Sequence, residues 1–139
     1  MSTSPARAEL DRRIEDIESG YEYLLAYAAQ GRETDKGGAG GGAPVREHLK
    51  RMARALDGLG AAVRECAGAV DPELPAAAAD FLAAIDADAR VARAAIALVL
   101  ARPDVSSQLV DNLNASIHLR AILTDLFVVD EALKIKPAP

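Results

Sequence analysis

Apolar residues recur along this chain at alternating intervals of three and four positions. The repeat runs through Leu10, Ile14, Ile17, Tyr21, Leu24 and Ala28, and it resumes as Val45, Leu49, Met52, Leu56, Leu59, Val63, Cys66 and Val70. This spacing puts one apolar line on each helix, as in helices that pack at a shallow angle. We therefore expect helices over about 5–30 and 44–70.

The second half of the chain carries two apolar lines per helix. Between 72 and 101 one line is Leu74, Ala78, Phe81, Ile85, Asp88, Ala92, Ala95 and Val99, and a second is Leu82, Ala89, Ile96 and Leu100. Between 105 and 133 the lines are Val110, Leu113 and Ile117, then Leu119, Ile122, Leu126, Val129 and Leu133. We do not expect a single core to bury both lines of each helix, so we expect a homodimer through these two helices.

Four helices of similar length predict an all-α fold, a four-helix bundle in one domain of 139 residues. The tight connections at Asp71-Pro72 and Pro103-Asp104 favour antiparallel neighbours in up-down-up-down order. The long Gly-rich segment 31–43 is expected to be a flexible loop. It is long enough to cross the bundle, so a crossover topology stays open.

The glycines at 38–43 match G-x-G-x-x-A, a pattern of dinucleotide-binding loops. That loop needs a β-strand before it, whereas here a long amphipathic helix precedes it. We interpret the segment as a linker.

Composition and charge exclude several classes of protein. Aromatic residues make up 4% of the chain and there is no Trp, which is unlike an all-β sandwich. The net charge of −5 disfavours nucleic acid as a partner, and we interpret the basic cluster Arg46, Lys50, Arg51 and Arg54 as a solvated face. The lone Cys66 cannot form an internal disulfide, and we expect it to be a small core residue.

We expect no membrane association and no secretory signal, hence a cytoplasmic protein, and Arg- and Ala-rich usage suggests a bacterial gene. The chain has two histidines and one cysteine, too few for the usual metal sites of helical bundles. We therefore expect neither a metal nor another cofactor, and no catalytic residue is assigned.

A candidate binding surface follows from antiparallel packing of the first and last helices. Such packing would bring polar aromatic, histidine and amide side chains to the end of the bundle that carries the Gly-rich loop. They are Tyr23, Tyr27, His48, Asn112, Asn114 and His118. Amphipathic aromatics among adaptable polar groups are typical of binding surfaces. A solvated face beside a frayed helix end is the alternative, and Tyr21 is expected in the core.

The sequence favours a non-catalytic helical interaction protein, such as a small adaptor, assembly factor or accessory subunit, that acts as a homodimer. A protein partner would bind at the Tyr/His/Asn end. The alternative is a small-ligand sensor or an enzyme with a polar pocket at that end, in which His118 is the only candidate general base.

Overall fold

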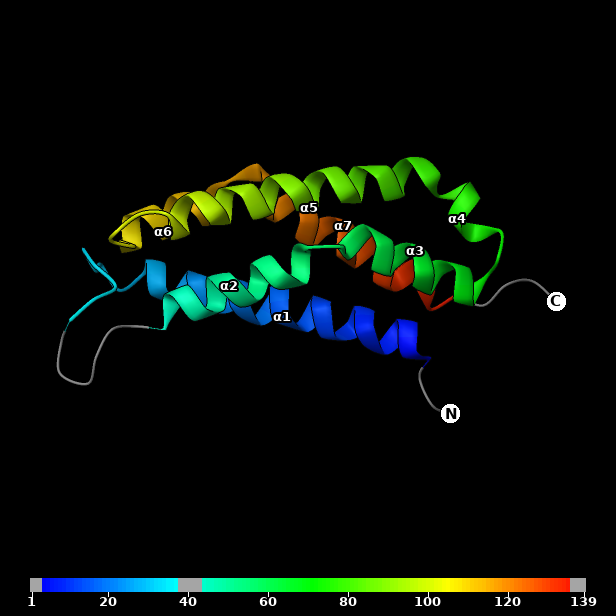
Figure 1. Cartoon of the computed structure of the whole chain (residues 1–139), viewed down its shortest axis with the longest axis horizontal. Helices are drawn as coiled ribbons and strands as arrows, with labels where there is room; N and C mark the ends of the chain where they lie inside the picture. The colour runs from blue at the N-terminus through cyan, green and yellow to red at the C-terminus, as the bar shows by residue number, and fades with distance from the viewer. Residues whose placement is uncertain (1–3, 38–43, 136–139) are drawn as a thin grey trace.

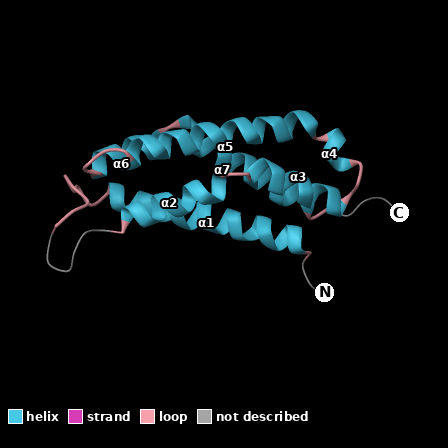
Figure 2. Cartoon of the chain, in the orientation of Figure 1, coloured by secondary structure: helices cyan, strands magenta, loops and turns pink. Residues whose placement is uncertain are grey.

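The computed structural model describes residues 4–37 and 44–135 of the chain. All regular structure within these ranges is helical (Figure 2), which confirms the all-α class. The expected division into four uninterrupted helices is wrong, because three of the four segments are broken. The described residues form seven helices, labelled α1 to α7 in Figure 1.

The first expected helix is α1, Pro5–Ala28. It begins where the sequence indicates, since the Ser4 hydroxyl accepts a hydrogen bond from the Arg7 N–H at 3.1 Å and Pro5 occupies the first turn. Gly31 follows with φ +66°, a left-handed conformation that suits glycine and turns the chain away from the helix.

The segment 44–70 is two helices, α2 (Val45–Leu56) and α3 (Leu59–Val70). Asp57 is extended and Gly58 has φ +78°, so the helical hydrogen bonds stop there. Leu56 and Leu59 are both buried on either side of the break, which is why the apolar repeat runs through it without a visible interruption.

The last two segments are also interrupted. The short α4 (Leu74–Ala77) precedes α5 (Ala79–Leu100), with Pro75 in the first turn of α4. The segment 105–133 divides into α6 (Ser107–Ala115) and α7 (Ile117–Leu133), because Ser116 between them is extended, with ψ 136°.

The helices run alongside one another in an elongated arrangement (Figure 1). Polar contacts give their directions. Arg7 near the start of α1 pairs with Asp130 near the end of α7, and Arg46 at the start of α2 reaches the Leu100 carbonyl at the end of α5. These pairs of helices are therefore antiparallel.

The core contains nearly all of the predicted apolar lines, including Leu10, Ile17 and Leu24 of α1, each with no exposed surface. It takes up most of both lines of 72–101 and of 105–133, so the expectation that one core leaves one of these lines uncovered is wrong. Gly20 allows α1 and α2 to approach closely, since a Cβ atom there would lie 2.4 Å from the Met52 Cγ. None of the described helices is both long and apolar enough to cross a membrane.

Candidate functional site

The six predicted site residues fall into separate environments. Tyr23 of α1 and His48 of α2 stack, with their ring centroids 3.9 Å apart and their planes 10° from parallel. Tyr27 lies one turn along α1, 6.2 Å from Tyr23 between ring centroids. The antiparallel packing of α1 and α2 thus brings three of the six residues together.

Tyr27 is a buried residue that contributes to the fold. Its side chain has no exposed surface, and its hydroxyl donates to the Val105 carbonyl at 2.6 Å. The Tyr27 carbonyl accepts a hydrogen bond from the Ser107 hydroxyl at 2.7 Å, so this residue holds the end of α1 against the start of α6. A partner outside the folded chain does not reach the Tyr27 ring.

His48 is partly buried beneath the ring of Tyr23. Burial, and then the nearby charge of Arg51, lower the pKa of the His48 imidazole, so the neutral ring is favoured. Its Nδ1 atom is buried without a hydrogen-bond partner among the described residues. A neutral stacked ring contributes a flat contact surface rather than a charge.

The two asparagines and His118 are not joined to this stack by any hydrogen bond or ring contact within residues 4–37 and 44–135. Asn112 is exposed and accepts a hydrogen bond from Gln108 one turn earlier on α6. Asn114 is 5% exposed, and neither amide atom has a partner in the described chain. His118 is exposed in the first turn of α7.

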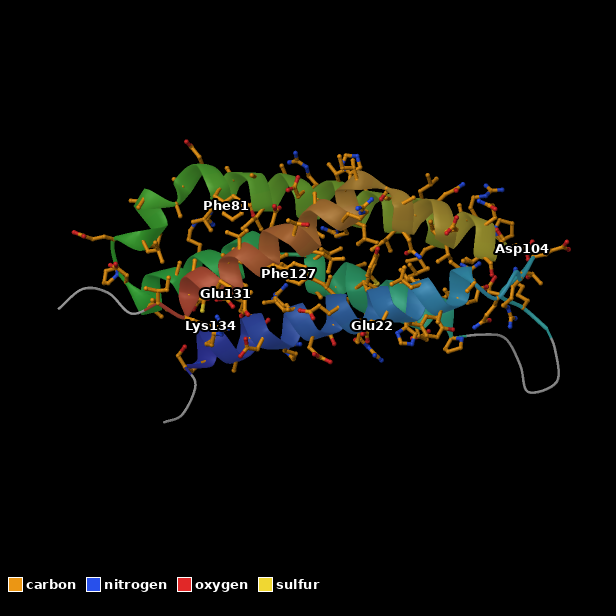
Figure 3. The ribbon with its side chains drawn as sticks, turned by 180° about the vertical axis from the view of Figure 1, so that it is seen from behind. Glu22, Phe81, Asp104, Phe127, Glu131 and Lys134 are labelled. Carbon is orange, nitrogen blue, oxygen red and sulfur yellow. The ribbon has the colours of Figure 1, made fainter. Side chains whose placement is uncertain are left out.

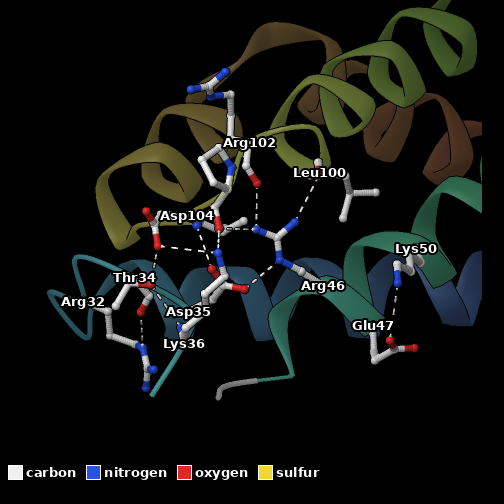
Figure 4. Close-up of polar contacts among 12 residues, drawn as sticks. Arg32, Thr34, Asp35, Lys36, Arg46, Glu47, Lys50, Leu100, Arg102 and Asp104 are labelled. Carbon is white, nitrogen blue, oxygen red and sulfur yellow. Dashed lines mark hydrogen bonds and ion pairs between the residues drawn. The ribbon is translucent and has the colours of Figure 1, made fainter. Parts of the chain in front are cut away.

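The strongest polar cluster at this end was not predicted. Asp35, only 6% exposed, accepts hydrogen bonds from the Val105 N–H at 2.8 Å and from Arg46 Nε at 2.7 Å (Figure 4). Burial alone would raise the pKa of Asp35, but these donors outweigh burial and hold the pKa below its ordinary value. The carboxylate is therefore stabilised in its charged form.

Arg46 completes this cluster, which we call the loop clasp, by donating to carbonyls at the last residue of α5 and just after it. Its guanidinium contacts the carbonyl oxygens of Leu100 at 3.0 Å and Arg102 at 2.8 Å. Carbonyls at a helix end lack partners within the helix, and a guanidinium satisfies several of them at once. The interpretation of Arg46 as part of a solvated face is a misreading, because Arg46 ties α2 to α5.

The loop clasp also fixes part of the segment expected to be flexible. Thr34 donates to the Asp104 carboxylate at 2.6 Å, and Lys36 donates to the Pro103 carbonyl. Residues 31–37 are thus attached to the α5–α6 connection. The G-x-G-x-x-A segment and the rest of the expected loop, 38–43, lie outside the described residues.

An open hollow of about 580 Å³ adjoins this end of the molecule. It lies between the end of α1, the following turn and the start of α6, and its lining residues are Ala28, Gly31, Arg32, Glu33, Ser106, Ser107, Gln108 and Asp111. The Arg32 guanidinium lies 5.8 Å from the centre of the Tyr27 ring, at the edge of this hollow. None of the six predicted residues lines it.

A pair of carboxyl groups, Asp88 of α5 and Asp125 of α7, forms a second titratable site. Burial, and then the hydrogen bond and charge of Asp88, raise the pKa of Asp125 to about 7. Asp125 Oδ2 is buried and has no hydrogen-bond donor among the described residues, so nothing there compensates a negative charge and the protonated carboxyl of Asp125 is favoured. Asp88 occupied an apolar position in the sequence repeat, which was the one available signal of this pair.

These features do not form an arrangement of nucleophile, base and orienting group. The described part of the chain also holds no group of three or more His, Cys, Asp or Glu side chains placed to bind a metal ion. No protein-family model, no curated protein and no solved structure matches this chain.

Proposed function

We propose that this chain is a non-catalytic helical interaction module that acts as a homodimer through α5 and α7. The observation that carries the proposal is where large apolar side chains remain exposed. Among the described residues, those on or directly after α5 and α7 are Phe81, Val91, Leu98, Ile117, Phe127, Val128 and Ile135. Leu25 on α1 is the other one. Figure 3 shows Phe127 along α7, on the side of the molecule opposite to the view of Figure 1.

Apolar surface gathered on two neighbouring helices is typical of a protein interface. Leu98, Ile117 and Val128 are each more than half exposed, at 66%, 72% and 53%. Between α3, α4, α5 and α7 lies a small apolar hollow of about 80 Å³ that continues this surface toward Phe81 and Val128. Covering this face with a second copy would remove it from water.

We further propose that the seven helices act as four antiparallel rods, a four-helix bundle in which α2 with α3, α4 with α5, and α6 with α7 each form one broken rod. Buried residues continue across the α2–α3 and α6–α7 breaks, and Leu74 of α4 packs partly buried against the same core, which supports this assignment. A cytoplasmic location is also proposed, since the lone Cys66 is buried and free and the fold uses no disulfide.

Analytical ultracentrifugation of the full chain tests the dimer. We expect a species of twice the 14.6 kDa chain mass, and we expect Val128→Asp to sediment as the monomer because it places a charge in the interface. Leu25→Asp is the matched control, an exposed leucine on α1 that should leave the dimer intact. A wild-type monomer at about 100 μM would overturn the proposal, because an interface of standard size forms at lower concentrations.

The hollow beside Arg32 favours a second candidate, a sensor of a small polar ligand. Its lining is rich in hydrogen-bonding groups, which fits a polar metabolite better than an apolar one. A rise in melting temperature with one member of a metabolite panel, lost in Arg32→Ala, would support it. If no member raises the melting temperature and the chain is a dimer, the sensor is excluded for that panel and the interaction module is favoured.

A further inference from the structure

One side chain per turn of α7 faces outward along a single line. The members of this line, which we call the outer stripe, are Ile117, Arg120, Thr124, Val128, Glu131 and Ile135, spaced by three or four residues. All six are exposed, and Ile117 and Ile135 at its two ends are both 72% exposed. Ile135 lies two residues after the last residue of α7, Leu133, and its N–H donates to the Ala132 carbonyl.

The members of the outer stripe are spaced almost symmetrically about one level of the helix. An isoleucine stands at each end, and Thr124 and Val128 flank the centre. The midpoint of the Ile117 and Ile135 pair and that of the Thr124 and Val128 pair both fall at Leu126. A two-fold axis through that level would lay the stripe antiparallel on its own copy, with each isoleucine opposite the other.

The charges of the stripe are complementary about the same point. Arg120 and Glu131 lie on opposite sides of it at nearly equal distances along the helix. Arg120 forms no ion pair with another described residue, and Glu131 pairs only with Lys134 at 3.2 Å between two exposed groups. Figure 3 shows Glu131 and Lys134 near the end of α7. Arg120 is therefore free to meet a partner of opposite charge, and Glu131 can meet one in exchange for a weak, exposed pair.

A concave surface lies at the start of the stripe. This hollow of about 500 Å³ is lined by Ala115, Ile117, Arg120, Ala121, Thr124 and Asp125. In the antiparallel register, the second copy's Val128 and Ile135 lie opposite this surface. Each copy thus offers both the hollow and the side chains that cover it, which is the property of an isologous interface.

We propose that a second copy of this chain packs α7 against α7 in antiparallel orientation, around a two-fold axis near Leu126, with Arg120 opposite the second copy's Glu131 and Ile117 opposite its Ile135. This register rests on the proposed homodimer and makes it specific. Self-complementary charge selects another copy of the chain over an unrelated helix.

Charge reversal tests the register. Arg120→Glu and Glu131→Arg each place like charges together at two points of the dimer, so we expect each to weaken dimerisation by about tenfold or more at low salt. The double variant Arg120→Glu/Glu131→Arg should recover most of the wild-type affinity. Arg54→Glu, an exposed arginine on α2, is the control and should change nothing. Circular dichroism confirms that each variant is folded.

Disulfide capture gives an independent measurement. Chains carrying Ile117→Cys mixed with chains carrying Ile135→Cys should form a cross-linked dimer on oxidation. Either chain alone should not, because the two copies of one position lie about 27 Å apart in this register, from the rise of 1.5 Å per residue. The buried Cys66 of the wild-type chain is the background control.

The two proposals fail in different ways. A wild-type chain that sediments as a monomer overturns the homodimer and the register with it. A wild-type dimer that is unaffected by Arg120→Glu, or that the double variant does not restore, overturns the register alone and leaves the homodimer standing.

Discussion

The loop clasp and the α6–α7 break differ in whether their buried polar groups have hydrogen-bond partners. At the clasp, the Asp35 carboxylate and the Arg46 guanidinium each contact several partners across three segments of the chain. At the break, the buried amide of Asn114 and the hydroxyl of Ser116 have no partner among the described residues. The clasp stabilises a loop, whereas the break costs stability beside the exposed face of α7.

The largest expected effect comes from opening the clasp. Asp35→Ala leaves the Val105 N–H and the Arg46 guanidinium without their acceptor, so we expect a loss of about 3 kcal/mol in the free energy of unfolding. Urea denaturation measures it. Glu33→Ala, an exposed neighbour, is the control and should stay within about 0.5 kcal/mol. A loss below about 1 kcal/mol for Asp35→Ala would show that the loop clasp contributes little to the stability of the fold.

The carboxyl pair of Asp88 and Asp125 should make stability depend on pH in an unusual direction. Because the pKa of Asp125 is about 7 in the folded chain and near its ordinary value of 3.8 when unfolded, the folded state holds its proton more tightly. The stabilisation is complete below about pH 4 and is lost as pH rises through 7. The folded chain is thus destabilised by this group above neutrality.

Asp125→Asn removes this titration while keeping the shape of the side chain. At pH 8 we expect a gain of about 2 kcal/mol in the free energy of unfolding, reduced from the full pKa difference because the site is partly solvated. At about pH 3.5, where the carboxyl is largely protonated in both the folded and the unfolded state, we expect little change. Equal gains at both pH values would contradict a raised pKa of Asp125. Asp111→Asn, an exposed carboxyl on α6, is the control.

A smaller gain is expected at the break itself. Asn114→Leu replaces a buried, unpartnered amide by an apolar group of similar size, which should raise the free energy of unfolding by about 1 kcal/mol. Asn112→Leu, two residues earlier and exposed, should change it little. If Asn114→Leu instead destabilises the chain, the amide makes a bond that stabilises the fold, and the contrast with the clasp fails.

The apolar repeat predicted the helices well because each buried position depends on neighbours within one helix. It missed the breaks for the same reason. Leu56 and Leu59 keep the three-residue interval across Asp57 and Gly58, so a left-handed glycine inside the repeat leaves the pattern intact. At Ser116, the break is visible only as poor helix formers, which also fit a frayed end.

The polar sites were harder to predict because they join distant positions. Asp35 meets Val105 across 70 residues, and nothing near Asp35 in the sequence marks it as buried. Tyr27 was assigned to a binding surface by its residue type, but its hydroxyl reaches a carbonyl 78 residues away. The expected antiparallel order placed Tyr23 and His48 at the same end of the bundle, but the stacking of their rings was not predicted.

The ion pair between Arg7 and Asp130 also bears on how the chain acquires its structure. It joins residues 123 positions apart, and it marks the packing of the first long helix against the last. During synthesis, the apolar line of α1 emerges long before α6 and α7 exist to cover it. Contacts between such distant segments close late and slow folding relative to local helix pairs. While only the first half of the chain exists, α1 can be covered only by α2 and α3, and completion of the core awaits α6 and α7.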